Sequence, residues 1–338
     1  MTLALHRSRI VLALCLLGSL SLLWSLTGCR QGERKTELRK TSVRLLWLGQ
    51  AQFAGLYVAQ RNGYFKDQGL LVNIEPGGPD ISPVLLVASG SNDFGIAAGT
   101  DILQARSNGV PVVAVASIFQ RNPVVFFSKK EKNITSPKDF PGHTVGIKYG
   151  LEIEYYFNIM IKKAGVDIRR VKQVPIKFDM ARFFSGDVDV WSGYAINEPI
   201  TAEEKGLQLN LIFCDEWGVP AVGDTIFATE EMLRRDPEKV SAFLRAVTKG
   251  WQQAINDPDG AVAATLAANP SLDRDHERRM FNAAIPLIRY GGKPIGSIDP
   301  EKWRLMHSMM VESGLLKAPI EVDKAYNRTF IQMAYAGP

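Results

Sequence analysis

Short apolar runs alternate with amphipathic segments from Ser42 onward, which is the pattern of layered α/β domains with mostly parallel strands. The apolar runs predict strands at 43–48, 71–74, 93–97, 112–118, 144–147, 171–174, 188–191 and 209–213. Helices are predicted between them at 55–62, 83–88, 101–108, 153–164, 180–184 and 199–205. These elements form two βαβ-rich sets, one on each side of residues 129–141.

From about Val222 the pattern changes to successive helices. Asp236 and Pro237 are the residue types of a helix N-cap and first turn, and apolar residues then recur on one helical face. Further helices are predicted at 260–268, 276–287 and 300–313. Trp251 and Trp303 stand at apolar helical positions, so we expect both rings to pack in the core.

A short internal similarity indicates two related halves. Ser89-Gly90 is followed by Asp93, and Ser185-Gly186 is followed by Asp189, and in both halves a strand and a new helix come next. This makes residues 99–101 and 195–198 equivalent strand-to-helix corners. In an open α/β sheet the ligand binds outside the carboxyl ends of the strands, close to such corners. Thr100 and Asn197 are therefore candidate ligand contacts, and helix capping is the alternative role for each.

The N-terminal segment has the features of an export signal. Arg7 and Arg9 precede an uncharged run of 17 residues, 10–26, and residues 26–29 (Leu-Thr-Gly-Cys) resemble the bacterial lipoprotein box. The resemblance implies that residues 1–28 are a signal peptide, that Cys29 carries lipid, and that residues 29–41 are a tether. A transmembrane anchor is the alternative, because the run reaches the lower limit of a spanning helix.

The composition allows a large core and does not favour a nucleic-acid partner. The chain has 338 residues, 46% of them hydrophobic and 22% charged, which suits two domains. Its formal net charge is +5, yet 33 basic and 33 acidic residues balance beyond Thr41. The excess positive charge therefore belongs to the signal and tether. Cys214 is the one cysteine after Cys29, so no intramolecular disulfide is expected.

Motifs of enzymes are missing from the sequence. It contains no nucleophile elbow, no HExxH and no glycine-rich phosphate loop. His143, His276 and His307 are far apart, and none has a second ligand at metal spacing. We therefore expect a protein that is not an enzyme and that has neither a metal nor a cofactor.

The stretch from Trp47 to Ile74 carries a family resemblance. Its phrases Gln-Ala-Gln-Phe-Ala-Gly from Gln50, Gly-Tyr-Phe from Gly63 and Gly-Leu-Leu-Val from Gly69 resemble the opening of solute-binding proteins of ABC importers. The group in question is the thiamine-pyrimidine-precursor and sulfonate/nitrate group. Further matches follow in order at 77–78, 89–95, 101–106, 109–112 and 197–199, so that the resemblance covers about 43–257.

The resemblance implies a type II periplasmic-binding-protein fold, in which two α/β lobes close on one small ligand. Lobe one would comprise residues 42–124 and 222–338, and lobe two residues 125–221, with crossovers near 122–127 and 219–227. The protein would be exported, anchored by Cys29 to the extracytoplasmic or periplasmic face of a membrane, and monomeric. Its partners would be the ligand, an ABC permease and the permease's ATPase.

Candidate ligand contacts are aromatic and amide groups at strand ends. Flat rings suit stacking on a planar heterocycle, and a carboxylate such as Glu198 can accept a hydrogen bond from a ring amino group. Only Lys148 and Arg121 are cations near these loops, whereas a sulfonate or nitrate site needs cations. The candidates are Trp47, Gln50, Gln52, Phe53, Tyr57 and Thr100 from lobe one, and Tyr149, Trp191, Tyr194, Asn197 and Glu198 from lobe two.

An aminopyrimidine precursor of thiamine is the expected ligand, with riboflavin next and a sulfonate- or nitrate-type anion as a further alternative. For Trp47 and Tyr57, burial in the core remains an open alternative to ligand contact. Two other classes of protein share the fold. One is a pyrimidine-synthesis enzyme with a cysteine-rich motif and a histidine, neither of which appears here. The other is an extracytoplasmic sensor that reports ligand without transporting it.

Overall fold

The computed structural model describes residues 37–336. The predicted signal peptide, Cys29 and most of the predicted tether lie outside these residues. Two five-stranded sheets organise the described chain. The first contains β1 (Arg39–Arg44), β2 (Leu70–Glu75), β3 (Phe94–Ala97), β4 (Val112–Phe119) and β10 (Gly223–Thr229). The second contains β5 (Val124–Lys129), β6 (Thr144–Ile147), β7 (Lys172–Pro175), β8 (Val190–Tyr194) and β9 (Leu209–Phe213).

The two sheets share one topology. Their strand orders are β2-β1-β3-β10-β4 and β7-β6-β8-β5-β9. In each sheet the first three strands of that order run parallel, and the fourth is antiparallel to both of its neighbours. Each sheet with its helices is called a lobe below. The chain passes from the first lobe to the second between β4 and β5, and returns between β9 and β10.

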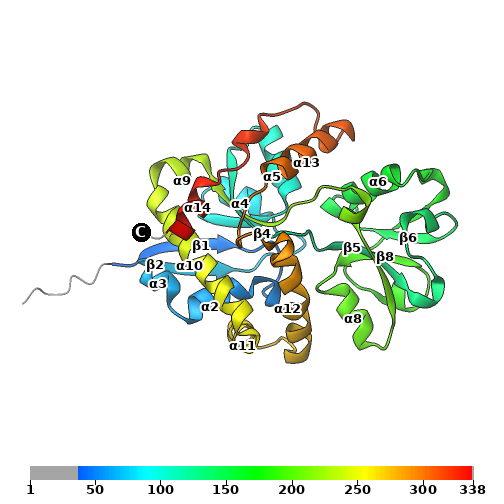
Figure 1. Cartoon of the computed structure of the whole chain (residues 1–338), viewed down its shortest axis with the longest axis horizontal. Coiled ribbons are helices and arrows are strands. Elements are labelled where there is room, and N and C mark those ends of the chain that lie inside the picture. Colours follow the sequence, from blue (N-terminus) through cyan, green and yellow to red (C-terminus); the bar gives the residue numbers. More distant parts are fainter. Residues whose placement is uncertain (1–36, 337–338) are drawn as a thin grey trace, which may run out of the picture. The chain divides into compact units, whose positions relative to one another are not determined.

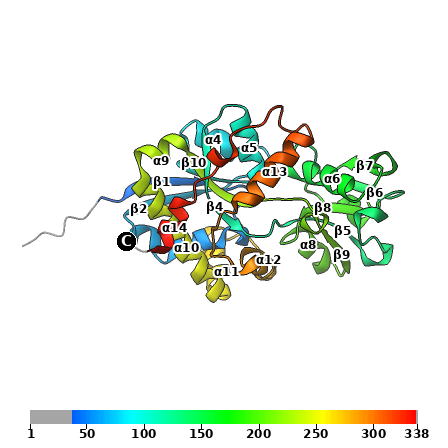
Figure 2. The ribbon, with the colours of Figure 1, turned by 45° about the horizontal axis from the view of Figure 1, so that its top comes forward.

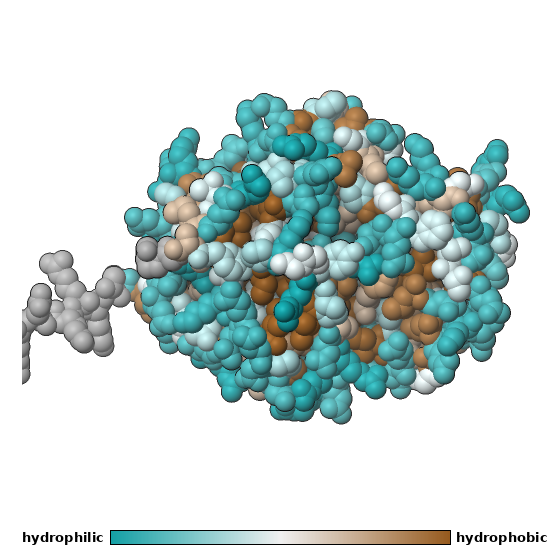
Figure 3. All heavy atoms as spheres, viewed as in Figure 1, coloured by the Kyte–Doolittle hydropathy of each residue, from teal (hydrophilic) through white to brown (hydrophobic). Residues whose placement is uncertain are grey.

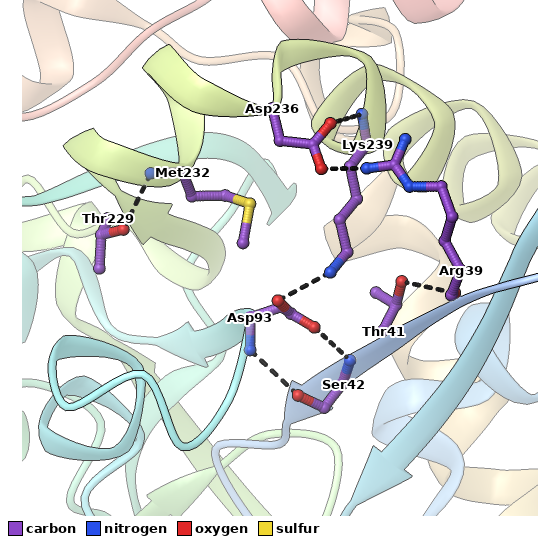
Figure 4. Close-up of polar contacts among 8 residues, drawn as sticks. All are labelled: Arg39, Thr41, Ser42, Asp93, Thr229, Met232, Asp236 and Lys239. Carbon is purple, nitrogen blue, oxygen red and sulfur yellow. Dashed lines mark hydrogen bonds and ion pairs between the residues drawn. The ribbon is translucent and has the colours of Figure 1, made fainter.

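The internal similarity in the sequence corresponds to one repeated hydrogen bond. A carboxylate oxygen of Asp93 accepts from the backbone N–H of Ser42 at 2.9 Å, and one of Asp189 accepts from that of Thr144 at 2.9 Å. Each aspartate thereby joins the start of one strand to the neighbouring parallel strand. Asp93 also accepts from Nζ of Lys239 at 2.8 Å, which ties the first sheet to a helix that covers it (Figure 4).

Helices cover the first sheet on both faces. One face holds α2 (Ala54–Arg61), α3 (Tyr64–Asp67), α10 (Pro237–Asn256), α11 (Pro258–Ala268), α12 (Arg274–Ile288) and α14 (Thr329–Ala336). The other holds α4 (Pro83–Ala88), α5 (Gly99–Ser107) and α13 (Pro300–Glu312). Helix α9 (Glu230–Arg235) follows β10 directly. Figure 2 shows α14 beside α10 and α13 beside α5, contacts that bring the C-terminal helices onto the first lobe.

The second lobe has fewer helices. They are α6 (Glu152–Lys163), α7 (Ala181–Phe184) and α8 (Glu198–Glu204), and Figure 1 shows α6 and α8 with the green strands β5, β6 and β8. One apolar cluster includes Tyr155 of α6 together with Met306 of α13, so the core is continuous from one lobe to the other. Hydrophilic residues (teal) dominate the face shown in Figure 3.

The structure confirms the predicted element types, with one large shift in position. The apolar run at 43–48 predicts a strand, but β1 ends at Arg44. The chain after β1 then passes over Gly77, whose backbone N–H donates to the carbonyl oxygen of Trp47 at 2.9 Å. An added Cβ at Gly77 would lie 2.2 Å from the carbonyl oxygen of Leu45, so this approach requires glycine. Conversely, residues 39–41 of the predicted tether belong to β1, where they pair with residues 70–72 of β2.

Both tryptophans expected in the core lie there, since Trp251 is 2% exposed and Trp303 is 0% exposed. Among residues 37–336, no helix combines the length and the apolar character needed to cross a bilayer.

Helices α2 and α10 approach closely because Gly55 of α2 and Gly250 of α10 face each other. An added Cβ on Gly55 would lie 2.2 Å from the Trp251 ring. We expect Gly55→Ala to lower the free energy of unfolding by about 1–3 kcal/mol, measured by urea denaturation, because the added methyl overpacks this crossing. Gly78→Ala is the control, since its Cβ would meet no atom nearer than 3.9 Å. Equal stability of the two variants would contradict the close packing.

Candidate functional site

Polar and aromatic side chains of both lobes meet beside the two chain crossings, and this place is called the lobe junction. Its first-lobe part includes the short 3-10 helix Ala51–Phe53, which follows β1. Glu277 of α12 fixes this helix, because its carboxylate accepts from the N–H of Ala51 at 2.6 Å. Gln52 then donates from Nε2 to Asp224 of β10 at 2.8 Å.

Three carboxyl groups gather at the lobe junction. Asp224 belongs to β10, Asp101 to the first turn of α5, and Glu152 to the first turn of α6. Glu152 accepts hydrogen bonds from the hydroxyls of Tyr194 at 2.6 Å and Tyr156 at 2.9 Å. The three carboxyls thus come from elements of both lobes and lie close enough for the charges of Asp101 and Asp224 to act on Glu152.

Burial raises the pKa of each of these carboxyl groups. It raises the pKa of Asp101 to about 6 and that of Asp224 to about 7, the latter against the hydrogen bond from Gln52. Burial also raises the pKa of Glu152 to about 8, and the neighbouring charges of Asp101 and Asp224 add to the effect. The cluster therefore holds protons near neutral pH.

Of the five buried side-chain polar atoms that have no hydrogen-bond partner among the described residues, two stand on the first-lobe side of the lobe junction. They are Oγ1 of Thr100 and Oδ1 of Asp224, whose residues are 3% and 2% exposed. Asp224 also has a φ of 40°, in the left-handed region that residues other than glycine seldom adopt. Buried polar atoms are nearly always paired, so both groups are suited to meet a ligand.

Aromatic rings from both lobes also meet at the junction. The Trp47 ring of the first lobe lies 4.5 Å from that of Phe178 in the second, centroid to centroid, with a 52° tilt. Nζ of Lys148 lies 5.1 Å from the centroid of the Phe178 ring. Phe178 is 39% exposed, so this contact is reached by solvent.

A polar contact joins α12 to the second lobe. Nδ1 of His276 lies 3.0 Å from a carboxylate oxygen of Glu204, and Nε2 lies 3.3 Å from Oδ1 of Asn197. The imidazole therefore bridges two residues at the ends of α8. Asn197, a predicted ligand contact, thus has a side-chain partner in the first lobe.

The chain can be placed among known proteins by its sequence. Residues 50–261 match the model of the family described as NMT1/THI5 like. The chain belongs to the NMT1/THI5-like family. This family assignment agrees with the resemblance of residues 47–74, and the solved structures below share the periplasmic-binding-protein fold.

Relatives within the NMT1/THI5-like family include binding proteins. The riboflavin-binding protein RibY of Chloroflexus aurantiacus is 29% identical over 87% of this chain and 86% of its own. The formylaminopyrimidine-binding protein of Halalkalibacterium halodurans is 30% identical over 86% of this chain and 90% of its own. A synthase is a more distant relative. The 4-amino-5-hydroxymethyl-2-methylpyrimidine phosphate synthase of Legionella pneumophila is 25% identical over 86% of this chain and 93% of its own.

Among solved structures, the periplasmic sulfonate-binding protein SsuA of Methylobacillus flagellatus aligns with a TM-score of 0.69. The alignment covers 89% of this chain and 94% of SsuA at 18% identity, which shows that the two proteins share a fold.

Several predicted contacts occupy the lobe junction. Gln50 donates from its amide nitrogen to Gln52 at 2.9 Å, and Gln52 in turn holds Asp224. Thr100 and Tyr194 belong to the polar cluster described above. Tyr149 is 48% exposed, and its hydroxyl lies 3.5 Å from the Gln173 side-chain oxygen.

Other predicted contacts have structural partners. Both carboxylate oxygens of Glu198 are engaged, one by Nζ of Lys148 at 2.5 Å and the other by the N–H of Tyr194 at 2.9 Å. Gly193 permits this arrangement, because an added Cβ there would lie 2.4 Å from Cδ of Glu198. Glu198 thus forms an internal ion pair with a buried lysine rather than presenting a free carboxylate.

Three predicted aromatic contacts are buried in the core instead. Phe53 is 1% exposed and Tyr57 is 5% exposed, and both belong to the apolar cluster beneath α10. Trp191 is 0% exposed and packs against Phe183, with ring centroids 6.2 Å apart. Its position differs from the expected one because side chains alternate along β8, and Trp191 points to the apolar face.

The predicted contacts omitted Glu152, Tyr156, Asp224, Phe178 and His276, and Asp101 entered only as part of the strand-to-helix corner 99–101, with helix capping as the alternative. A usable signal existed for Asp101 and Glu152, because each acid stands in the first turn of a helix that follows a predicted strand. Asp224 follows Gly223 inside the predicted second crossover. No local pattern marks Phe178 or His276, since both reach the junction only through tertiary packing.

The raised pKa values predict how apo stability depends on pH. The folded protein keeps protons that the unfolded chain has lost, so stability from these groups is present near pH 4 and is lost as pH rises through about 6 to 8. Replacing Asp224 by Asn removes one such group. We expect the Tm of Asp224→Asn to equal that of the wild type near pH 4 and to exceed it by roughly 2–6 °C at pH 8.

Thermal unfolding followed by circular dichroism between pH 4 and 8 measures this difference. Asp189→Asn is the control with the opposite sign. Burial raises the pKa of Asp189, but the hydrogen bonds from Thr144 and Lys132 outweigh burial, so the pKa is lowered. That variant should be less stable than the wild type throughout the range above pH 5. A pH-independent effect of Asp224→Asn would contradict the raised pKa.

Proposed function

We propose that the protein is the extracytoplasmic solute-binding protein of an ABC importer and captures a small aromatic heterocycle by closure of its two lobes. A pyrimidine precursor of thiamine is the favoured ligand, and riboflavin is the second candidate. Lipid on Cys29 would hold the protein beside the permease. Within the NMT1/THI5-like family, relatives named for binding a formylaminopyrimidine and riboflavin support this choice.

The observation that carries the proposal is the contact of Trp47 with Phe178 across the lobe junction. Each lobe supplies one ring, and Nζ of Lys148, which is paired with Glu198, lies 5.1 Å from the centroid of the Phe178 ring. A planar heterocycle that takes the place of this ring–ring contact would gain a ring contact from each lobe and hydrogen bonds along its edge. Closure would then follow from ligand contacts made to both lobes at once.

The same groups disfavour a sulfonate or nitrate ligand. Lys148, the cation beside Phe178, is already paired with Glu198 at 2.5 Å. Arg121 donates to Asp215 at 2.8 Å and to Glu216 at 2.7 Å, so its charge is also compensated. An anion would in addition approach three carboxyl groups.

Two other activities are less well supported. The synthase relatives are the reason to weigh a pyrimidine-synthesis activity. Against it, this chain has one cysteine beyond Cys29, and that residue, Cys214, is buried. A cysteine-rich catalytic motif is thus missing. A sensor role would use the same binding site and differ only in the membrane partner.

Ligand affinity should depend on both rings of the cross-lobe contact. We expect Trp47→Ala and Phe178→Ala each to weaken binding of an aminopyrimidine about 3- to 10-fold in calorimetry, because a ring contact contributes about 0.5–1.5 kcal/mol. Tyr335→Ala is the matched control, since Tyr335 is 40% exposed against 39% for Phe178. Unchanged affinity in both ring variants, or binding confined to taurine or nitrate in a ligand screen, would refute the proposed site.

The lipid anchor has a separate test. Cells fed a labelled fatty acid should incorporate the label into the wild-type protein and not into Cys29→Ser, because the serine hydroxyl cannot receive the thioether-linked lipid. Cys214→Ser keeps the lipid-bearing cysteine and should be labelled as the wild type is. Immunoprecipitation followed by detection of the label measures all three. A wild-type protein without label, or a labelled Cys29→Ser protein, would exclude lipidation at Cys29.

A further inference from the structure

We propose that Asp224 is the anchoring acceptor for the ligand and that the carboxyl cluster Asp101, Glu152 and Asp224 selects a heterocycle bearing N–H donors. We further propose that the cluster releases protons as the ligand binds. This inference rests on the proposed function, since it specifies the chemistry of the ligand at the same junction.

The hydrogen bonds of Asp224 leave one oxygen for a ligand. Oδ2 accepts from Nε2 of Gln52 at 2.8 Å, whereas Oδ1 has no partner among the described residues although Asp224 is 2% exposed. The hydroxyl of Thr100 is likewise buried and unpartnered. A buried acceptor without a donor costs free energy, so its presence favours a ligand group that donates.

Backbone geometry gives Asp224 a fixed direction. Its φ of 40° is costly for a residue with a side chain, and such outliers concentrate at binding sites. The preceding Gly223 lies against the other crossing, where an added Cβ would approach Pro123 to 3.1 Å and the Asn122 side-chain nitrogen to 3.2 Å. Asp224 therefore stands at the end of the second chain crossing, next to a glycine that lies against the first, so that a ligand contact there acts close to both.

Glu152 is positioned differently. Each of its oxygens already accepts from a phenol of its own lobe, Tyr194 at 2.6 Å and Tyr156 at 2.9 Å. These two tyrosines act as positioning residues for the Glu152 carboxyl, which is near enough to Asp101 and Asp224 for their charges to raise its pKa. When these carboxyls are ionised their like charges repel, and a donor placed among them relieves the repulsion. A ligand with amino or protonated ring nitrogens therefore favours the closed arrangement, whereas an anion opposes it.

Proton release follows from the same geometry. Burial keeps part of the cluster protonated near neutral pH, with the pKa of Asp224 at about 7. A carboxyl that carries its own proton on Oδ1 does not accept there, so the proton leaves for solvent as the N–H of the ligand takes its place. Affinity should consequently rise between pH 5 and 8, in the direction that ionises Asp224.

Calorimetry on the lipid-free chain from residue 30 onward, with 4-amino-5-hydroxymethyl-2-methylpyrimidine as the probe, tests the proposal. The wild type should bind more tightly at pH 8 than at pH 5, and its apparent enthalpy at pH 7 should vary with the ionisation enthalpy of the buffer. The analogue that carries hydrogen in place of the ring amino group should bind at least 10-fold more weakly. Asp224→Asn should also lose at least 10-fold in affinity, together with the rise between pH 5 and 8.

The side-chain amide of the Asp224→Asn variant is informative because the Gln52 donor fixes its orientation. In Asp224→Asn the amide oxygen should face the Gln52 donor, and the NH₂ group would then face the ligand and present a donor to a donor. Asp189→Asn, remote from the junction, controls for the loss of a carboxylate and should bind as the wild type does.

The outcomes separate the two proposals. Binding of the probe with no effect of Asp224→Asn, with no effect of removing the amino group, or without proton release would overturn the present inference and leave the proposed function intact. A wild type that binds neither this pyrimidine nor riboflavin but binds taurine or nitrate would overturn the proposed function itself.

Discussion

Removing a carboxyl group from water costs free energy, and the structure concentrates that cost at the lobe junction. Asp101, Glu152 and Asp224 are each held where burial favours the protonated form. The core on either side of the junction must supply the stability that this arrangement removes. A binding protein gains from it, because groups that are poorly solvated in the empty protein respond strongly to the right ligand.

The two lobes are built on the same sheet topology and the same aspartate hydrogen bond. Both sheets have one strand order and one pattern of strand directions, and an aspartate fixes the neighbouring strand in each. The lobes differ in what surrounds the sheet. The first is covered by helices on both faces, many of them C-terminal, whereas the second has only α6, α7 and α8. The first lobe therefore offers a rigid platform for the 3-10 helix that carries Gln52 and for Asp224.

Local pattern predicted the fold well because most elements are set by short apolar runs and by Gly, Pro and Asp at their ends. It failed at β1, where the apolar run at 45–48 leaves the sheet through a contact with Gly77 that is remote in sequence. The site was harder to predict for the same reason. Strand ends led to Gln52, Thr100 and Tyr194, which lie at the lobe junction, but the alternation within β8 sends Trp191 to the core, and a buried lysine pairs with Glu198.

The strand order also has a consequence for how the protein is assembled. All strands of the second sheet, β5 to β9, lie in one uninterrupted stretch of chain, residues 124–213. In the first sheet, β10 lies between β3 and β4, which are made more than a hundred residues earlier. During synthesis from the N-terminus, the second lobe can complete its sheet while β3 and β4 still await their partner. Asp224 arrives with that last strand, so the chain acquires the proposed ligand acceptor in the same step that closes the first sheet.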